Sequence, residues 1–287
     1  SMFNNKMKLI IMNKRNFILG ATTVALLAID VCAFFKNPST TNITSMLKNN
    51  EQKRTKTMPP AAIAASSSGS QPPAVNMSAK EQKTAKIWNR FADGYAKQPI
   101  KDEESYQKKL EMTREYMAPH SKVLEFGCGT GGTALLHAPY VSSVHAIDIS
   151  SRMIEIAKQR QKETGIENVD FQCTGIDSMD VPDESYDIVL GLSVLHLLPN
   201  KDGVMKKIYN KLKPGGYFMS STICMGDMSR MIRWVTSPLS FLGVLPELNI
   251  FTKAELTQSM EQAGFTIEGE FQSGKDKAAV FLVARKL

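Results

Sequence analysis

The stretch VLEFGCGTGG, residues 123–132, places four glycines in six positions directly after an apolar run. A strand that ends in such a turn lets a ligand approach backbone N–H groups at the start of the next helix, because glycine has no Cβ. Gly127, Gly129 and Gly132 also spell GxGxxG, and Asp148 follows about 20 residues later. The stretch therefore predicts a ligand-binding turn between a strand and a helix, and NAD is one candidate ligand.

Around this loop, apolar strands and amphipathic helices alternate. The expected order is helices at 80–97 and 103–117, strand 122–127, helix 133–140, strand 143–149, helix 151–163, strands 169–173 and 186–192, helix 203–212, turn 213–216, strand 217–223, helix 252–264 and strands 265–271 and 277–286. Such alternation predicts an α/β fold with a doubly wound, largely parallel sheet and helices on both faces. The last two strands, close in sequence, predict an antiparallel hairpin at the sheet edge.

The net charge of +7 is confined to the N-terminus. Residues 1–79 hold nine Lys/Arg and two acids, whereas residues 80–287 hold 26 of each and are neutral. A surface that tracks phosphates needs clustered Lys/Arg, so we expect no nucleic-acid partner. The four cysteines form no CxxC pair and predict neither a metal site nor a disulfide framework.

The first 78 residues carry features of targeting rather than of a core. Residues 17–35 are a 19-residue apolar run after a basic start, which fits a membrane anchor or a secretory signal. Residues 36–58 contain seven Ser/Thr, five Lys/Arg and one acid, a composition typical of transit peptides. We therefore expect a leader or anchor over 1–58, a disordered linker over 59–78 and one domain over 79–287.

The leader also predicts a location. A signal-like segment followed by a transit-like one resembles the two-part leaders of algae with complex plastids, with a cut after Val31-Cys32-Ala33 and Phe34 next. We expect a membrane-anchored or organelle-targeted protein, including a plastid location, and a cytoplasmic protein is the alternative. Association with a membrane would then be through residues 17–35.

Glu125 separates the candidate ligands of the glycine loop. It lies two residues before Gly127, where a carboxylate would repel a pyrophosphate and attract a ligand with ammonium and sulfonium groups. Two helices also precede the loop, whereas the glycine turn usually opens an NAD-binding domain. Both features favour a cationic ligand over NAD.

Five motifs in order resemble the class I S-adenosylmethionine-dependent methyltransferases over about residues 85–287. The family's acid-x-Gly-x-Gly-x-Gly motif is matched by residues 125–131, and AIDIS is similar to the end of its second strand. CTGIDSM resembles the adenine-contact segment, while PDESYDIVLGLSVLHLL and LKPGGYFMSS are similar to the fourth and fifth strand motifs of the small-molecule, ubiquinone-methyltransferase-like (type 11) branch. The resemblance implies a Rossmann-like sheet of order 3-2-1-4-5-7-6 with strand seven antiparallel and N-terminal cover helices.

It also implies S-adenosylmethionine as cofactor, S-adenosylhomocysteine as product, and Asp148 as the acid that grips both ribose hydroxyls. Ser150 or Ser151 is expected to cap the following helix. The usual Gly-Asp-Ala of the adenine segment is absent, so the adenine contact stays open between Ile176 and Asp177. The implied cofactor-binding residues are Glu125, Gly127, Cys128, Gly129, Gly131, Asp148, Ile149, Ile176, Asp177 and Leu192.

The acceptor site is expected where the fourth and fifth strands end. His196 is a candidate general base, and packing is its alternative role. Met225 and Trp234 line a partly apolar pocket or belong to the core, and Trp88 and Tyr95 of the first helix cover it. We expect methyl transfer to a small thiol, amine, phenol or quinone-like acceptor without a metal. An inactive cofactor-binding subunit and an NAD-dependent oxidoreductase are the alternatives.

Overall fold

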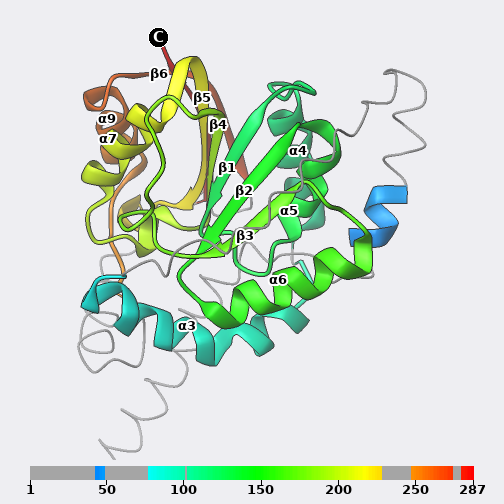
Figure 1. The fold of residues 1–287 in the computed structure, drawn as a ribbon. Helices are drawn as coiled ribbons and strands as arrows, with labels where there is room; N and C mark the ends of the chain where they lie inside the picture. Colours follow the sequence, from blue (N-terminus) through cyan, green and yellow to red (C-terminus); the bar gives the residue numbers. More distant parts are fainter. Residues whose placement is uncertain (1–42, 49–76, 101, 228–246, 274–278) are drawn as a thin grey trace, which may run out of the picture.

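The computed structural model describes residues 43–48, 77–100, 102–227, 247–273 and 279–287. Their centre is a seven-stranded sheet of order β3-β2-β1-β4-β5-β7-β6 (Figure 1), which confirms the predicted order. The strands are β1 (Lys122–Phe126), β2 (Ser143–Asp148), β3 (Val169–Cys173), β4 (Tyr186–Leu192), β5 (Leu212–Ile223), β6 (Phe265–Ser273) and β7 (Ala279–Lys286). Strand β7 runs antiparallel to both of its neighbours, as predicted, and the other pairs are parallel.

Helices cover both faces of this sheet. They are α3 (Ala79–Lys97), α4 (Glu103–Arg114), α5 (Gly132–His137), α6 (Ser151–Thr164), α7 (Lys201–Lys211) and α9 (Lys253–Gln262). In Figure 1, α7 and α9 lie on one side, α4, α5 and α6 on the other, and α3 crosses the edge at which the parallel strands end. The doubly wound architecture therefore leaves that edge as the place for a ligand.

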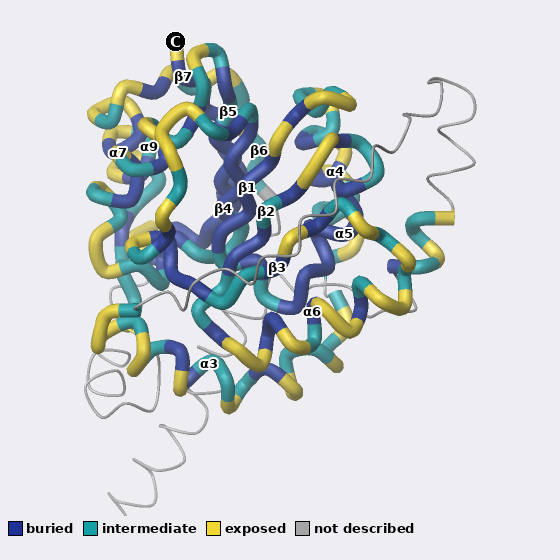
Figure 2. The backbone as a smooth tube through the Cα atoms, viewed as in Figure 1, coloured by how far each residue is buried: buried dark blue, intermediate teal, exposed yellow. Residues whose placement is uncertain are grey.

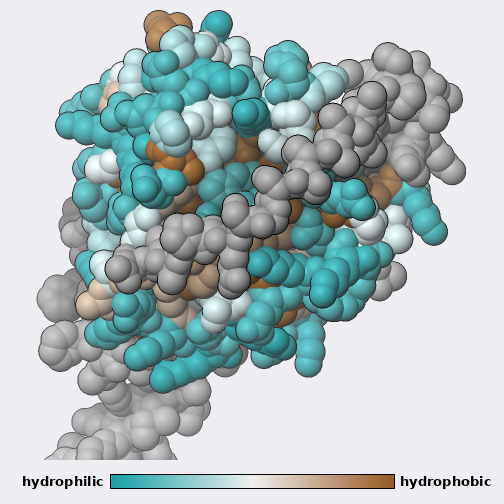
Figure 3. Space-filling model, in the orientation of Figure 1, coloured by the Kyte–Doolittle hydropathy of each residue, from teal (hydrophilic) through white to brown (hydrophobic). Residues whose placement is uncertain are grey.

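The core lies on both faces of the sheet because the central strands are apolar almost throughout. Four of the five residues of β1 are buried, and β4 is buried at five of seven. Figure 2 shows the same pattern, with buried strands inside half-buried helices. In Figure 3, polar side chains cover most of the outer surface, and apolar surface shows mainly toward the middle of the view.

The predicted turn at 213–216 lies inside strand β5. Tyr186 pairs with Leu212, and Ile188 pairs with Tyr217, so the intervening residues of β5 form a bulge. Gly215 has a φ of 78°, a left-handed conformation that favours glycine. The Pro-Gly-Gly pattern predicts a chain reversal, but hydrogen bonding to β4 on both sides of these residues keeps the chain in the sheet.

Helix starts follow the expected capping chemistry. Ser78 begins α3 with a capping box, in which its Oγ accepts from the Glu81 N–H at 3.3 Å and its own N–H donates to Glu81 Oε2 at 2.8 Å. Ser150 caps α6, which decides between the two predicted serines.

Most of the predicted leader and linker lies outside the described residues, including the apolar segment 17–35. Within the described ranges, every helix is too short or too polar to cross a bilayer. The boundaries 1–58, 59–78 and 79–287 and the location of the protein therefore stay predictions.

One short helix of the predicted leader contributes to the core. Residues 43–48 are helical, and Ile43 is fully buried in the same apolar cluster as Leu110, Leu136 and Val141. Met46 and Leu47 pack against this cluster. The composition of residues 36–58 did not indicate such a contact, because one buried isoleucine in a polar segment has no periodic signal.

This packing predicts that residues 43–48 stabilise the domain. Replacing Ile43 with Asp in the full chain should lower the free energy of unfolding by roughly 3 kcal/mol, because a fully buried apolar side chain is lost and a charge takes its place. Urea denaturation followed by circular dichroism would measure this. Lys48→Asp, at an exposed position of the same helix, is the matched control. Equal stability of the two variants would show that the helix does not belong to the domain.

Candidate functional site

The glycine loop follows β1 and leads into α5. Gly127 and Gly131 have φ values of 66° and 76°, which L side chains rarely adopt. A Cβ on Gly127 would lie 2.6 Å from Val194 Cγ2, and one on Gly131 would lie 2.6 Å from Phe171 Cζ. Backbone conformation and space both require glycine here, so the loop presents bare backbone to the pocket above it.

Asp148, at the end of β2, holds this loop in place. Its Oδ2 accepts from the Gly129 N–H at 2.9 Å, and its Oδ1 accepts from the Ser150 N–H at 2.8 Å. Burial raises the pKa of Asp148 to about 6, against the opposing effect of these two backbone donors. The carboxylate therefore joins the glycine loop to the start of α6 and is ionised at neutral pH.

An outer pocket extends over the loop toward α3. Seven of the ten predicted cofactor residues line it, together with the predicted cover residues Trp88 and Tyr95. The seven are Gly127, Gly129, Asp148, Ile149, Ile176, Asp177 and Leu192. Gly131 instead caps α5, behind the loop.

An inner cavity lies behind the loop and shares Tyr95, Gly127, Leu192 and Ser193 with the outer pocket. It contains the other two predicted residues, Glu125 and Cys128, and also Lys109, His137 and Ser221. Its volume is about 40 Å³, compared with about 170 Å³ for the outer pocket. Since one water needs roughly 10–15 Å³ by the same measure, the inner cavity fits a small polar group rather than a whole acceptor.

The walls of the inner cavity carry polar atoms that need partners. Glu125 Oε2, both ring nitrogens of His137 and the hydroxyls of Ser193 and Ser221 are buried, and none finds a hydrogen-bond partner among the residues that the structure describes. Burial, with a smaller effect of the Asp148 charge, raises the pKa of Glu125 to about 8. Burial lowers the pKa of Lys109 to about 7. A ligand with an ammonium group would give Glu125 Oε2 the partner that it lacks among the described residues, and Lys109 is a basic group in the same cavity.

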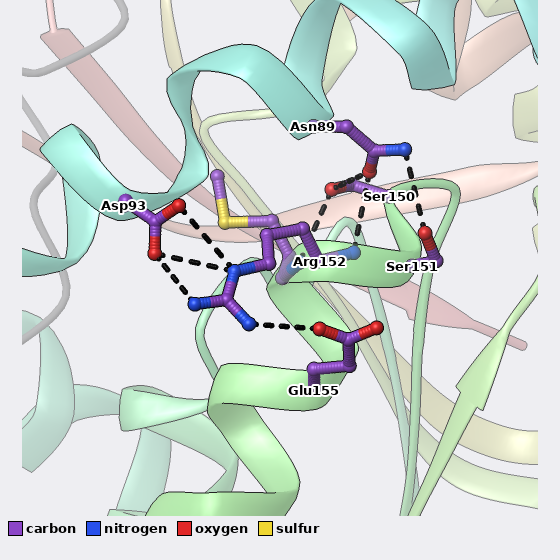
Figure 4. Close-up of polar contacts among 7 residues, drawn as sticks. Asn89, Asp93, Ser150, Ser151, Arg152 and Glu155 are labelled. Carbon is purple, nitrogen blue, oxygen red and sulfur yellow. Dashed lines mark hydrogen bonds and ion pairs between the residues drawn. The ribbon is translucent and has the colours of Figure 1, made fainter.

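Helix α3 is fastened over the pocket by polar contacts (Figure 4). Asn89 Oδ1 accepts from Ser150 Oγ at 2.7 Å and from the Arg152 N–H at 3.2 Å. Arg152 also pairs with Asp93 at 2.7 Å, but both side chains are about half exposed, so this ion pair adds little stability. The bond from Ser150 to Asn89 therefore links the cover helix directly to the residue that donates to Asp148.

A family model described as a methyltransferase domain matches residues 118–264, just over half of the chain. The chain belongs to the class I S-adenosylmethionine-dependent methyltransferases. Its cofactor is S-adenosylmethionine, as predicted. Neither the NAD-linked enzyme nor the inactive subunit is favoured by these matches.

Three proteins illustrate what this methyltransferase is similar to. It is 35% identical to the uncharacterized methyltransferase YcgJ of Bacillus subtilis, over 37% of this chain and 42% of YcgJ. It is 27% identical to malonyl-[acyl-carrier protein] O-methyltransferase of Priestia megaterium, over 62% of this chain and 64% of that protein. The crystal structure of geranyl diphosphate C-methyltransferase from Streptomyces coelicolor, in complex with S-adenosylhomocysteine, has a TM-score of 0.56 at 14% identity and covers 73% of this chain and 99% of that one. The chain thus spans less than two thirds of the curated relatives' length.

The methyltransferase does not bring all of the predicted acceptor residues together. The ring of His196 is fully buried, and its Nδ1 lies 3.0 Å from Thr222 Oγ1. Burial lowers its pKa to about 4. Neither the outer pocket nor the inner cavity includes His196 among its lining residues, so this geometry favours the packing role, and a role as base stays a prediction.

Of the two predicted acceptor residues that follow β5, the structure describes only one. Met225 is buried next to β5 and does not line the outer pocket, which agrees with the alternative of core packing. Trp234 lies outside the described residues. Instead, the short 3₁₀ helix after β4 (Leu195–Leu197) supplies Leu197 to the outer pocket, and Leu198 and Pro199, which follow this helix, also line it.

Several residues of the site were not predicted from the sequence. Lys109 reaches the inner cavity from α4, and Glu81 reaches the outer pocket from α3. The pattern Ser78-x-x-Glu81 indicates a capping box, so it marks the start of α3 but not the pocket. No local pattern indicates that Asn89 meets Ser150, which lies 61 residues away.

Proposed function

We propose that this methyltransferase transfers a methyl group from S-adenosylmethionine to a small, partly apolar acceptor. The observation that carries the proposal is the outer pocket, in which the bare glycine loop and Asp148 face an apolar wall. That wall contains Trp88, Leu197, Leu198 and Pro199. A polymer would need an open, charged surface, whereas this pocket lies under α3 and residues 80–287 are electrically neutral.

The residues present fit the cofactor. In this proposal Asp148 accepts from the two ribose hydroxyls, and its position in the pocket wall beside the glycine loop supports that role. The orphaned Glu125 Oε2 suits the α-ammonium group, and Lys109 in the same cavity suits the α-carboxylate. The bare backbone of Gly127 and Gly129 suits the aliphatic chain that joins the ribose to the amino-acid end of the cofactor.

When bound, S-adenosylmethionine supplies a methyl group already activated by its sulfonium. The protein's own task is therefore to align the acceptor with that methyl group and to exclude water. Tyr95 and Leu192, which border both the outer pocket and the inner cavity, are suited to shape the junction between them. A thiol acceptor needs little more than this, whereas an amine, a phenol or a quinone-like acceptor must also lose a proton.

Incubation of the full chain with methyl-labelled S-adenosylmethionine and a small-molecule extract tests the proposal. Label in a small molecule supports it. Cofactor binding without transfer would point to an inactive subunit, and transfer only to tRNA or protein would overturn the substrate class. His196→Asn then tests the base: a loss of about 100-fold in turnover with unchanged cofactor affinity would support that role, and full turnover would exclude it.

A further inference from the structure

Glu81 occupies an unusual place in the outer pocket. It belongs to α3, yet its carboxylate meets the segment that follows β3. Its Oε2 accepts three hydrogen bonds, from Ser178 Oγ at 2.6 Å and from the N–H and Oγ of Ser78 at 2.8 Å each. The other oxygen, Oε1, lies against Gly175, where a Cβ would come within 1.8 Å of it. Because three hydrogen bonds hold Oε2, the orientation of the carboxylate is fixed.

Gly175 is a glycine for reasons of space. Its φ lies outside the left-handed region, so the backbone there does not require glycine. A Cβ at this position would lie 1.8 Å from Glu81 Oε1 and 3.3 Å from Ile149 Cγ2. The carboxylate of Glu81 therefore fills the volume that a side chain at position 175 would fill.

The chemistry of the pocket indicates which part of the cofactor meets this carboxylate. In the proposed function, Asp148 holds the ribose, and the glycine loop and inner cavity hold the amino-acid end. The adenine ring then extends to the other side of Asp148, toward Gly175. Ile149, Met153 and Ile176 line that part of the pocket and offer apolar surfaces to a flat ring. Adenine carries an exocyclic amino group, which is a hydrogen-bond donor on its edge.

We propose that Glu81 is a specificity-determining residue whose Oε1 accepts a hydrogen bond from the exocyclic amino group of adenine. This proposal rests on the proposed function, and it replaces Asp177 as the acid that contacts the base. Asp177 is exposed, and the contact that fixes it runs from Lys207 Nζ to its backbone oxygen at 2.7 Å. Glu81 is instead held in place by Ser78 and Ser178.

The charge of Glu81 strengthens this assignment. Burial alone would raise the pKa of Glu81, but the hydrogen bonds from Ser178 and Ser78 outweigh it and leave the pKa below its usual value. Glu81 is therefore an ionised acceptor at neutral pH, and hydrogen bonds to charged groups are the stronger ones. Because Glu81 belongs to the cover helix, recognition of adenine also holds α3 over the pocket.

Calorimetry on the full chain tests the proposal with S-adenosylhomocysteine and S-inosylhomocysteine, in which a carbonyl replaces the amino group. The wild type should prefer the adenosyl ligand by at least about tenfold, because the carbonyl would face a carboxylate. Glu81→Gln keeps the helix cap, since Gln serves at that position of a capping box. Its amide can donate to a carbonyl, so the preference should fall several-fold. Asp177→Asn is the matched control and should keep the wild-type preference.

The outcomes separate the two proposals. A Glu81→Gln variant with the wild-type preference, or an Asp177→Asn variant without it, would overturn the role of Glu81 and leave the cofactor site intact. A wild type that binds neither ligand would overturn the proposed function itself.

Moving the carboxylate from position 81 to position 175 tests whether Glu81 has only a structural role. Gly175→Asp alone should weaken binding, because its Cβ displaces the Glu81 carboxylate. Combined with Glu81→Ala, Gly175→Asp puts an acid back in nearly the same place and should restore at least part of the adenosyl preference. If Glu81 acted only by capping α3 and by its hydrogen bond to Ser178, an acid at position 175 would not restore the adenosyl preference. A double variant without any preference would therefore count against the proposal.

Discussion

Replacing Asp148 with Ala should weaken the binding of S-adenosylmethionine by at least tens-fold while the protein stays folded. The proposed contacts to the two ribose hydroxyls are charge-assisted hydrogen bonds, each worth roughly 1.5–3 kcal/mol. The variant also loses the acceptors for Gly129 N–H and Ser150 N–H, which hold the glycine loop and the start of α6. Titration calorimetry with S-adenosylhomocysteine would measure the affinity, and thermal unfolding would monitor the fold.

Asp148→Asn is the matched control for this effect. It keeps the size of the side chain and one oxygen acceptor, so the loop should stay closer to its native position than in the alanine variant. Its affinity should lie between those of the wild type and Asp148→Ala. Unchanged affinity in the alanine variant, or a preference of the wild type for NAD, would contradict the assignment of the pocket.

The sheet and the glycine loop were predictable because their signals are local. Apolar strands and amphipathic helices alternate along the chain, and Glu125, Gly127 and Asp148 stand at the ends of two neighbouring strands. In a parallel sheet these ends meet at one edge, so spacing in the sequence becomes proximity in space. The resemblance to the family implied Ile149, Ile176 and Leu192, which also lie in the outer pocket.

Other features depend on side-chain direction and on distant partners. His196 and Leu197 are neighbours in one 3₁₀ helix, yet Leu197 lines the outer pocket while His196 points to Thr222 in the core. A position after the fourth strand does not indicate which of the two faces the ligand. Similarly, Glu81 meets Ser178 across 97 positions, and that contact follows from how α3 docks.

The inner cavity behind the loop determines the protonation state of Glu125, which could not be predicted from the sequence. Glu125 was expected to attract a cation, and the structure buries it without a partner for Oε2 among the described residues. Its raised pKa means that the ligand-free protein carries a neutral carboxyl group there. In the proposed function the carboxyl group therefore ionises only when the cofactor binds, since an ammonium group favours the ionised carboxylate.

Affinity for the cofactor should consequently rise with pH below about pH 7, by up to about tenfold per unit. The sign follows from the proton on Glu125. Below its pKa of about 8 the free protein holds this proton, and the bound protein, with an ammonium group beside Glu125, releases it. The increase should level off above pH 7, because Lys109, whose pKa is about 7, must then gain a proton in order to hold the cofactor's carboxylate. Asp148, with a pKa of about 6, adds a pH dependence of its own only toward the lower end of this range.

Glu125→Gln is the control, because it keeps the shape of the side chain and cannot release a proton. Its affinity should stay nearly constant up to about pH 7 and then fall as Lys109 loses its proton, so that its deficit relative to the wild type grows from small at pH 6.5 to tens-fold near pH 8. Calorimetry in buffers of different ionisation enthalpy should also find about one proton more released per cofactor bound to the wild type than to the variant at pH 7. A flat pH profile of the wild type below pH 7, or an equal proton release from both proteins, would show that the ammonium group does not bind at Glu125.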